Sequence, residues 1–87
     1  MYIGKIIGTV VSTRKDDALV GKKILVVQPL SEKLVPDGRA EICVDSVGAG
    51  VGEIVLVATG SSAGKVFGTQ SSPIDRAIVG IIDSVEA

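Results

Sequence analysis

Three glycines at alternate positions, Gly48, Gly50 and Gly52, lie between two segments that are typical of β-strands. Glycine is used where the backbone needs a positive φ, or where another chain approaches too closely for a Cβ atom. The surrounding run, residues 44–63, contains no histidine, cysteine or aromatic residue. This part of the chain can therefore contribute backbone and shape, but it offers none of the usual catalytic side chains.

The chain is short and unusually aliphatic for a single domain, which we place at residues 1–87. Its 87 residues are 46% hydrophobic, with 14 Val and 10 Ile but one Phe, one Tyr and no Trp. A domain of this size buries only roughly 60–65% of its unfolded surface. The chain has one cysteine and no cluster of metal ligands, so neither an internal disulfide nor a structural metal can compensate for this small core. The excess apolar surface predicts self-association.

Charge and composition argue against several classes of function. The net charge is −1 with scattered Lys and Arg, which favours neither nucleic acid nor anionic membrane as a partner. No apolar run approaches the roughly 20 residues of a membrane-spanning helix. Histidine is absent, so the commonest general base is missing. One unpaired cysteine fits a cytoplasmic location. We expect no cofactor, no metal and no enzymatic activity.

The pattern of β-branched residues and turn signals predicts five strands, over residues 2–13, 22–30, 41–47, 53–58 and 76–85. Gly4 and Gly8 predict a bent or bulged first strand, and Pro29 an edge or frayed end of the second. Short helical turns are expected over residues 60–66 and from Ser72. The fold class is therefore all-β: a small five-stranded OB-like barrel with one or two short helical turns.

Two glycine motifs superficially resemble nucleotide-binding loops. Residues 60–65 are one residue short of the phosphate-loop spacing, and Val66 stands where the magnesium-binding hydroxyl belongs. Residues 48–52 have the third glycine at the wrong offset for a dinucleotide fingerprint, and a strand follows instead of a helix. Both are therefore interpreted as structural loops. An enzyme acting on phosphate through residues 60–65 remains a third, weaker hypothesis.

The remaining candidate side chains have simple structural interpretations. Asp45 and Glu53 flank the glycine-rich run and are predicted to be solvated ends of a turn. Strand alternation places Cys43 on the face shared by Glu41 and Asp45, opposite Ile42 and Val44. Without a histidine partner, the Cys43 thiol is predicted to be a bystander. We interpret Asp75 and Arg76 as polar groups at a helix start, with an ion pair between subunits as the alternative.

Several segments, taken together, resemble the bacterial microcompartment vertex proteins. The matching segments are residues 8–13 (GTVVST), 21–28 (GKKILVVQ), 44–53 (VDSVGAGVGE), 60–63 (GSSA) and 73–83 (PIDRAIVGIID). They span nearly the whole chain in family order. The family usually follows GSSA with Arg, whereas here Gly64 precedes Lys65, which puts the role of that cation in doubt.

The resemblance implies a structural protein whose OB-like barrels form a homopentamer. Such rings cap the vertices of a polyhedral shell that is otherwise built from hexameric shell proteins, in the bacterial cytoplasm. The alternative, from a different class, is an OB-type binding module for a small ligand or single-stranded nucleic acid. A lack of aromatic stacking platforms argues against that alternative.

Two groups of residues are candidates for contacts in the ring. Because side chains of every copy would collide near a symmetry axis, we expect glycine-rich loops there. The ring- or pore-proximal candidates are Asp45, Ser46, Val47, Gly48, Ala49, Gly50, Gly52, Gly60, Ser61, Ser62 and Ala63. The subunit-packing candidates are Asp75, Arg76, Ile78 and Val79.

Overall fold

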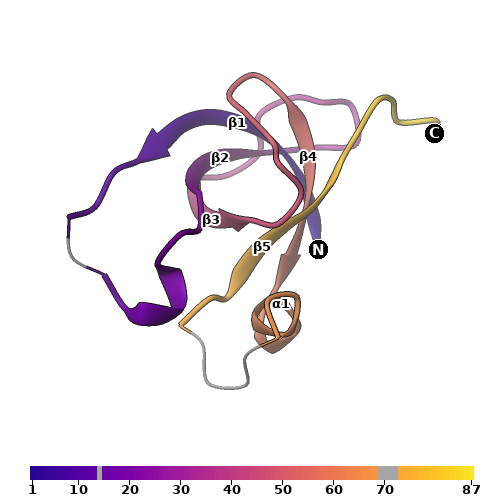
Figure 1. Cartoon of the computed structure of the whole chain (residues 1–87). Coiled ribbons are helices and arrows are strands. Elements are labelled where there is room, and N and C mark those ends of the chain that lie inside the picture. The colour runs from indigo at the N-terminus through magenta and orange to yellow at the C-terminus, as the bar shows by residue number, and fades with distance from the viewer. Residues whose placement is uncertain (14, 69–72) are drawn as a thin grey trace.

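Five strands close into a barrel in the order β1-β2-β3-β5-β4 in the computed structural model, which describes residues 1–13, 15–68 and 73–87 (Figure 1). The elements in chain order are β1 (Tyr2–Val10), η1 (Asp17–Leu19), β2 (Ile24–Leu30), β3 (Glu41–Asp45), β4 (Ile54–Thr59), α1 (Ser61–Lys65) and β5 (Arg76–Ile81). The predicted five-stranded, all-β fold with a short helix is confirmed.

Strand β1 connects the two sides of the barrel, because it pairs with both β2 and β4 in antiparallel register. The register with β2 shifts between Ile6 and Gly8, which confirms the predicted bulge. Gly4 serves close packing, since a Cβ there would collide with the Val27 side chain. Only the pairing of β3 with β5 is parallel among the described strand pairs.

Pro29 lies inside β2, paired with Gly4 of β1. The pairing of β2 with β3 stops at Val27, so no β3 residue needs the N–H group that proline lacks. The predicted edge position of Pro29 is therefore confirmed, although the strand continues to Leu30.

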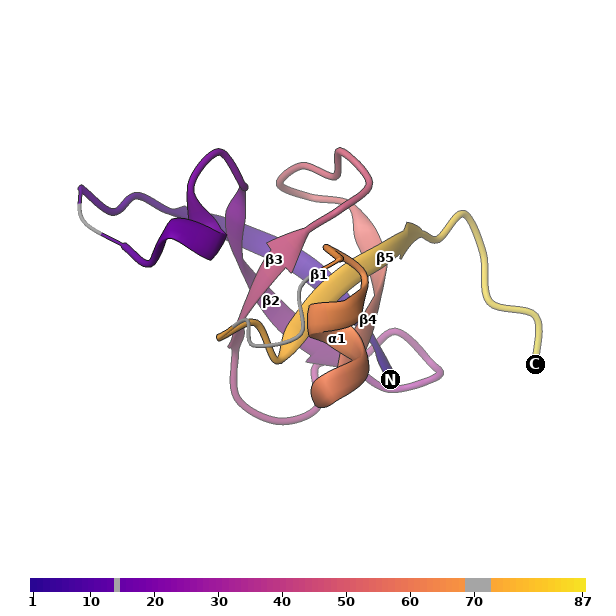
Figure 2. The ribbon, with the colours of Figure 1, turned by 60° about the horizontal axis from the view of Figure 1, so that its bottom comes forward.

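Two apolar clusters lie on the two faces of the sheet. The interior of the barrel is filled by fully or almost fully buried side chains, among them Ile6, Leu25, Val27, Cys43, Val55, Val57 and Ile78. An outer cluster contains Val44, Ala63, Ile74 and Ala77. Helix α1 packs against β4 and β5 on this outer side (Figure 2). The chain thus builds a closed core inside the sheet and a second, smaller one outside it.

The predicted alternation along β3 is correct, but its most buried side chain is the cysteine. Cys43 is fully buried in the barrel interior, whereas Ile42 is 53% exposed on the outer face. The thiol lies 3.4 Å from the Tyr2 hydroxyl. The bystander Cys43 is thus a packing residue of the core, which is common for a free cysteine.

The helix predicted to start near Ser72 is not present in the described residues. Ser72 itself lies outside them, and Pro73, Ile74 and Asp75 form an extended lead into β5. The signal was misleading because the Asp75 carbonyl is used across the fold, accepting a hydrogen bond from Gly60 N–H at 2.9 Å. Arg76 is therefore the first residue of a strand, and Asp75 directly precedes it. A single turn, η1, forms instead after Asp16, whose side chain accepts from Ala18 N–H.

Candidate assembly surfaces

The glycine-rich loop between β3 and β4 is organised by the two carboxylates that flank it. Asp45 accepts hydrogen bonds from the backbone N–H groups of Val47 at 3.1 Å, Gly48 at 2.9 Å and Ala49 at 3.0 Å. Its side chain is only 4% exposed and lies 3.7 Å from the Lys23 ammonium. The expectation of a solvated Asp45 was therefore wrong, because the turn leaves several N–H groups that one carboxylate can satisfy.

Glu53 also accepts a hydrogen bond from the loop backbone, at the other end of the loop, but from one N–H group only. Its carboxylate accepts from Gly50 N–H at 2.7 Å. The Ser46 backbone N–H and hydroxyl both donate to the Ile78 carbonyl, at 3.2 and 2.6 Å. These bonds attach the loop to β5 as well as to β3, so its outward face is held in one shape.

The three alternate glycines have different reasons to be glycine. Gly48 and Gly52 have φ angles of +79° and +94°, which side chains disfavour. Gly50 has no positive φ, and a Cβ there would meet only Glu53 Oε1, at 3.7 Å. The folded subunit thus requires glycine at positions 48 and 52 but has room for a side chain at position 50.

The second candidate loop, residues 60–63, leads directly into α1. Gly60 has a φ of +72°, and the Ser62 hydroxyl donates to the Thr59 carbonyl at 2.9 Å. Ala63 is fully buried in the outer cluster. Because Gly60 N–H and the Ser62 hydroxyl already have partners within the fold, this segment is a structural turn rather than a phosphate cradle. Lys65 is exposed in the last turn of the helix.

The structure does not bring the two candidate loops together. One precedes β4 and the other follows it, so a six-residue strand, about 20 Å long, separates them. Residues 60–63 instead adjoin Asp75, and residues 46–52 adjoin Ile78 through Ser46. Ile78 is fully buried in the subunit's own core, so its side chain is not available to a neighbour. Val79 is half-buried against the outer cluster.

Arg76 pairs with carboxylates of its own subunit. Its guanidinium lies 3.0 Å from Asp75 and 3.4 Å from Glu41. Nearby, burial raises the pKa of the Cys43 thiol, and burial together with the contact to Cys43 raises the pKa of Tyr2. A thiol held in its neutral form is a poor nucleophile. Groups of three or more potential metal ligands are absent from the described residues. This cluster therefore has no evident catalytic chemistry.

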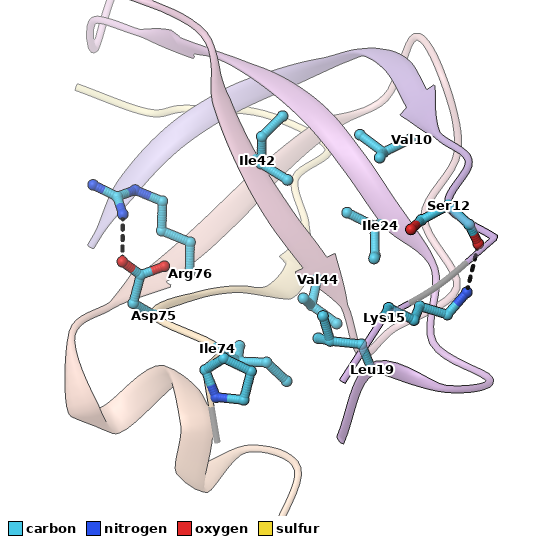
Figure 3. Close-up of a pocket in the computed structure, with 11 residues that line it drawn as sticks. Val10, Ser12, Lys15, Leu19, Ile24, Ile42, Val44, Ile74, Asp75 and Arg76 are labelled. Carbon is cyan, nitrogen blue, oxygen red and sulfur yellow. Dashed lines mark hydrogen bonds and ion pairs between the residues drawn. The ribbon is translucent and has the colours of Figure 1, made fainter. Parts of the chain in front are cut away.

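An open apolar groove of about 320 Å³ lies on the outer face of β2 and β3 (Figure 3). It is lined mainly by aliphatic side chains, among them Val10, Leu19, Ile24, Ile42, Val44 and Ile74. Lys15, Asp75 and Arg76 lie at its edge. This groove was not predicted from the sequence. Its one signal was the apolar pair Ile42 and Val44 on the same face of a strand.

Residues 1–83 match the family described as ethanolamine utilisation protein EutN/carboxysome, and the chain belongs to this family. It is 59% identical to the bacterial microcompartment shell vertex protein GrpN of Rhodospirillum rubrum, over 99% of this chain and 97% of GrpN. It is 46% identical to the shell vertex protein PduN of Salmonella typhimurium, over 98% of both chains. The solved GrpN pentameric microcompartment shell protein superimposes with a TM-score of 0.91 at 57% identity, covering 100% of this chain and 99% of GrpN.

These comparisons confirm the resemblance found in the sequence. The family is one of structural shell proteins rather than enzymes, and it supports a shell function over an OB-type binding module. In the described part of the chain, no helix is long and apolar enough to cross a membrane.

Proposed function

We propose that five copies of this chain form a ring that closes a vertex of a bacterial microcompartment shell in the cytoplasm. The observation that carries this proposal is the similarity to pentameric GrpN, which extends over essentially the full length of both chains. Surfaces that form a ring in one protein are expected to be largely retained at 57% identity and a TM-score of 0.91.

The surface of the subunit supports assembly independently of that similarity. Large aliphatic side chains remain exposed on several sides, including Val51 at 64%, Ile42 at 53% and Ile7 at 50%. A small domain with this much exposed apolar surface is expected to associate. Because a heterologous contact repeated by rotation closes into a ring, one pair of complementary surfaces is enough to build the assembly.

We place the glycine-rich loop, residues 45–52, nearest the five-fold axis. Gly50 supports this placement, because the subunit has room for a side chain there and yet carries none. Crowding by neighbouring copies accounts for that absence. We assign residues 60–63, Asp75 and Arg76 to subunit packing, since they lie at the opposite end of β4, together with Val79, which lies beside the middle of that strand.

In this function the ring fills a corner among hexameric shell proteins and limits the escape of small molecules from the lumen. Co-expression with hexameric shell proteins tests the proposal. With this chain present, closed polyhedral shells are expected by electron microscopy, and without it open or elongated assemblies. Equal closure in both samples would contradict a vertex function.

A further inference from the structure

The groove of Figure 3 is an apolar surface that the described subunit leaves open. Helix α1 covers one side of the outer cluster, but it does not cover the side that continues into the groove. There Ile42 remains 53% exposed. Lys15, Arg76 and Asp75 lie at its edge, and Asp75 is paired with Arg76 at 3.0 Å, so the edge carries an excess of positive charge. The surface therefore fits a small apolar projection that carries charges beside it.

The turn over residues 31–35, directly after β2, is such a projection. Leu34 and Val35 are 43% and 57% exposed. The turn is nevertheless well defined: Ser31 N–H donates to the Val35 carbonyl at 2.8 Å, and Leu34 N–H donates to the Ser31 carbonyl at 2.9 Å. Glu32 and Lys33 provide exposed charges of both signs beside the apolar tip.

Leu34 is the only non-glycine residue in the described chain with a positive φ, at +61°. Leucine is disfavoured in this conformation, whereas glycine, asparagine and aspartate accept it more readily. An exposed leucine in a strained backbone therefore indicates that its side chain, rather than its backbone, is needed at this position.

The groove and the turn lie at the two ends of β2. Ile24, the first residue of β2, lines the groove, and the turn follows Leu30, the last. Because Ile42 pairs with Val26, the groove reaches the middle of β2 and ends about four residues, or ~13 Å, before Leu30. In both ribbon views the beginning of β2 and the turn after its end lie on different sides of the barrel (Figures 1 and 2). A heterologous ring contact needs this arrangement, with two different surfaces on different sides of one subunit.

We infer that the turn over residues 31–35 of one subunit inserts Leu34 and Val35 into the groove of its neighbour. The exposed carboxylate of Glu32 complements the cationic edge of the groove, where Lys15 and Arg76 outnumber Asp75. This inference rests on the proposed ring and names the surfaces that close it.

Single substitutions on each surface test the inference in the full chain. Leu34→Asp removes the apolar tip but suits the positive φ, so the subunit is expected to fold at least as well. Ile42→Asp puts a charge into the groove at an exposed position. Each is expected to raise the concentration at which the ring dissociates by about tenfold or more, by analytical ultracentrifugation. Val66→Asp is the matched control, since Val66 is 43% exposed like Leu34.

Mixing the two variants shows whether the surfaces meet each other. The intact turn of the Ile42→Asp chain can enter the intact groove of the Leu34→Asp chain, but neither chain can extend further. At a concentration too low for either variant to form its own ring, the mixture is therefore expected to form dimers, whereas each variant alone is monomeric. Circular dichroism checks that both are folded. If Ile42→Asp is unfolded, Ile42→Ser replaces it.

Two results would overturn the inference while leaving the proposed function intact. One is that the wild-type chain forms a ring and that both variants form rings which dissociate at the same concentration as the ring of Val66→Asp. The other is a mixture of folded, monomeric variants that forms no dimer. A wild-type chain that is itself monomeric would instead contradict the proposed function.

Discussion

The two apolar clusters of this subunit differ in how completely the chain covers them. The barrel interior is closed, with Ile6, Val27, Val55, Val57 and Ile78 all without exposed surface. The outer cluster is covered by α1 but continues into an open groove at Ile42. The difference indicates a division of tasks: the interior determines whether one subunit folds, and the outer surface determines how copies associate.

Truncation in the barrel interior is expected to have the largest effect on folding. Ile78→Ala leaves a cavity in a site that is fully buried, and its cost is about 2–5 kcal/mol in the free energy of unfolding. Chemical denaturation of dilute protein measures it. Ile42→Ala, at the exposed end of the groove, is the control and is expected to cost much less. Equal losses at the two positions would contradict the division of tasks.

The carboxylate of Asp45 comes next, because it connects the loop to the barrel. Asp45→Ala leaves the N–H groups of Val47, Gly48 and Ala49 without their acceptor. The expected loss is about 1–3 kcal/mol in the free energy of unfolding. Glu53→Ala, which removes a single acceptor, is expected to cost less. If Asp45→Ala unfolds like the wild type, the loop does not depend on this carboxylate.

Substitutions at Gly48 and Gly50 are expected to distinguish effects on folding from effects on assembly within one loop. Gly48→Ala is expected to destabilise the subunit by about 1–2 kcal/mol, since its φ is positive. Gly50→Ala should leave subunit stability almost unchanged, because it meets no close contact. At Gly50 we expect the change in ring stability instead, and Gly50→Val should enlarge it. A Gly50→Val protein whose ring is as stable as the wild type would move the loop away from the axis.

Alkaline pH gives the smallest and most gradual effect. Burial raises the pKa of Cys43 above its ordinary value of 9.0, and that of Tyr2 is raised as well. The folded state therefore binds these protons more tightly than the unfolded state, so their contribution is fully present at neutral pH. It is lost as the pH rises above about 9, where the unfolded thiol ionises. Cys43→Ala should flatten the first part of this decline in urea midpoints, and an unchanged profile would exclude the thiol as its source.

Local sequence patterns predicted the strands well, because alternation and turn residues depend on nearby neighbours. The packing of Cys43 in the core and the burial of the Asp45 carboxylate were missed because each depends on a distant partner. Cys43 meets Tyr2, and Asp45 meets Lys23. The groove was missed for the same reason, since its walls come from both ends of the chain. The signal at Ser72 and Pro73 resembled a helix start, but the chain pairs with β3 and β4 as a strand from Arg76 onward.

The mass of the wild-type chain under native conditions tests the central claim most directly. Because the subunit has a closed core and an exposed apolar outer surface, the protein is expected to sediment at micromolar concentration as a particle of five times the subunit mass of 8.9 kDa. On dilution it should dissociate into subunits that remain folded by circular dichroism. A folded, strictly monomeric protein at micromolar concentration would contradict the account.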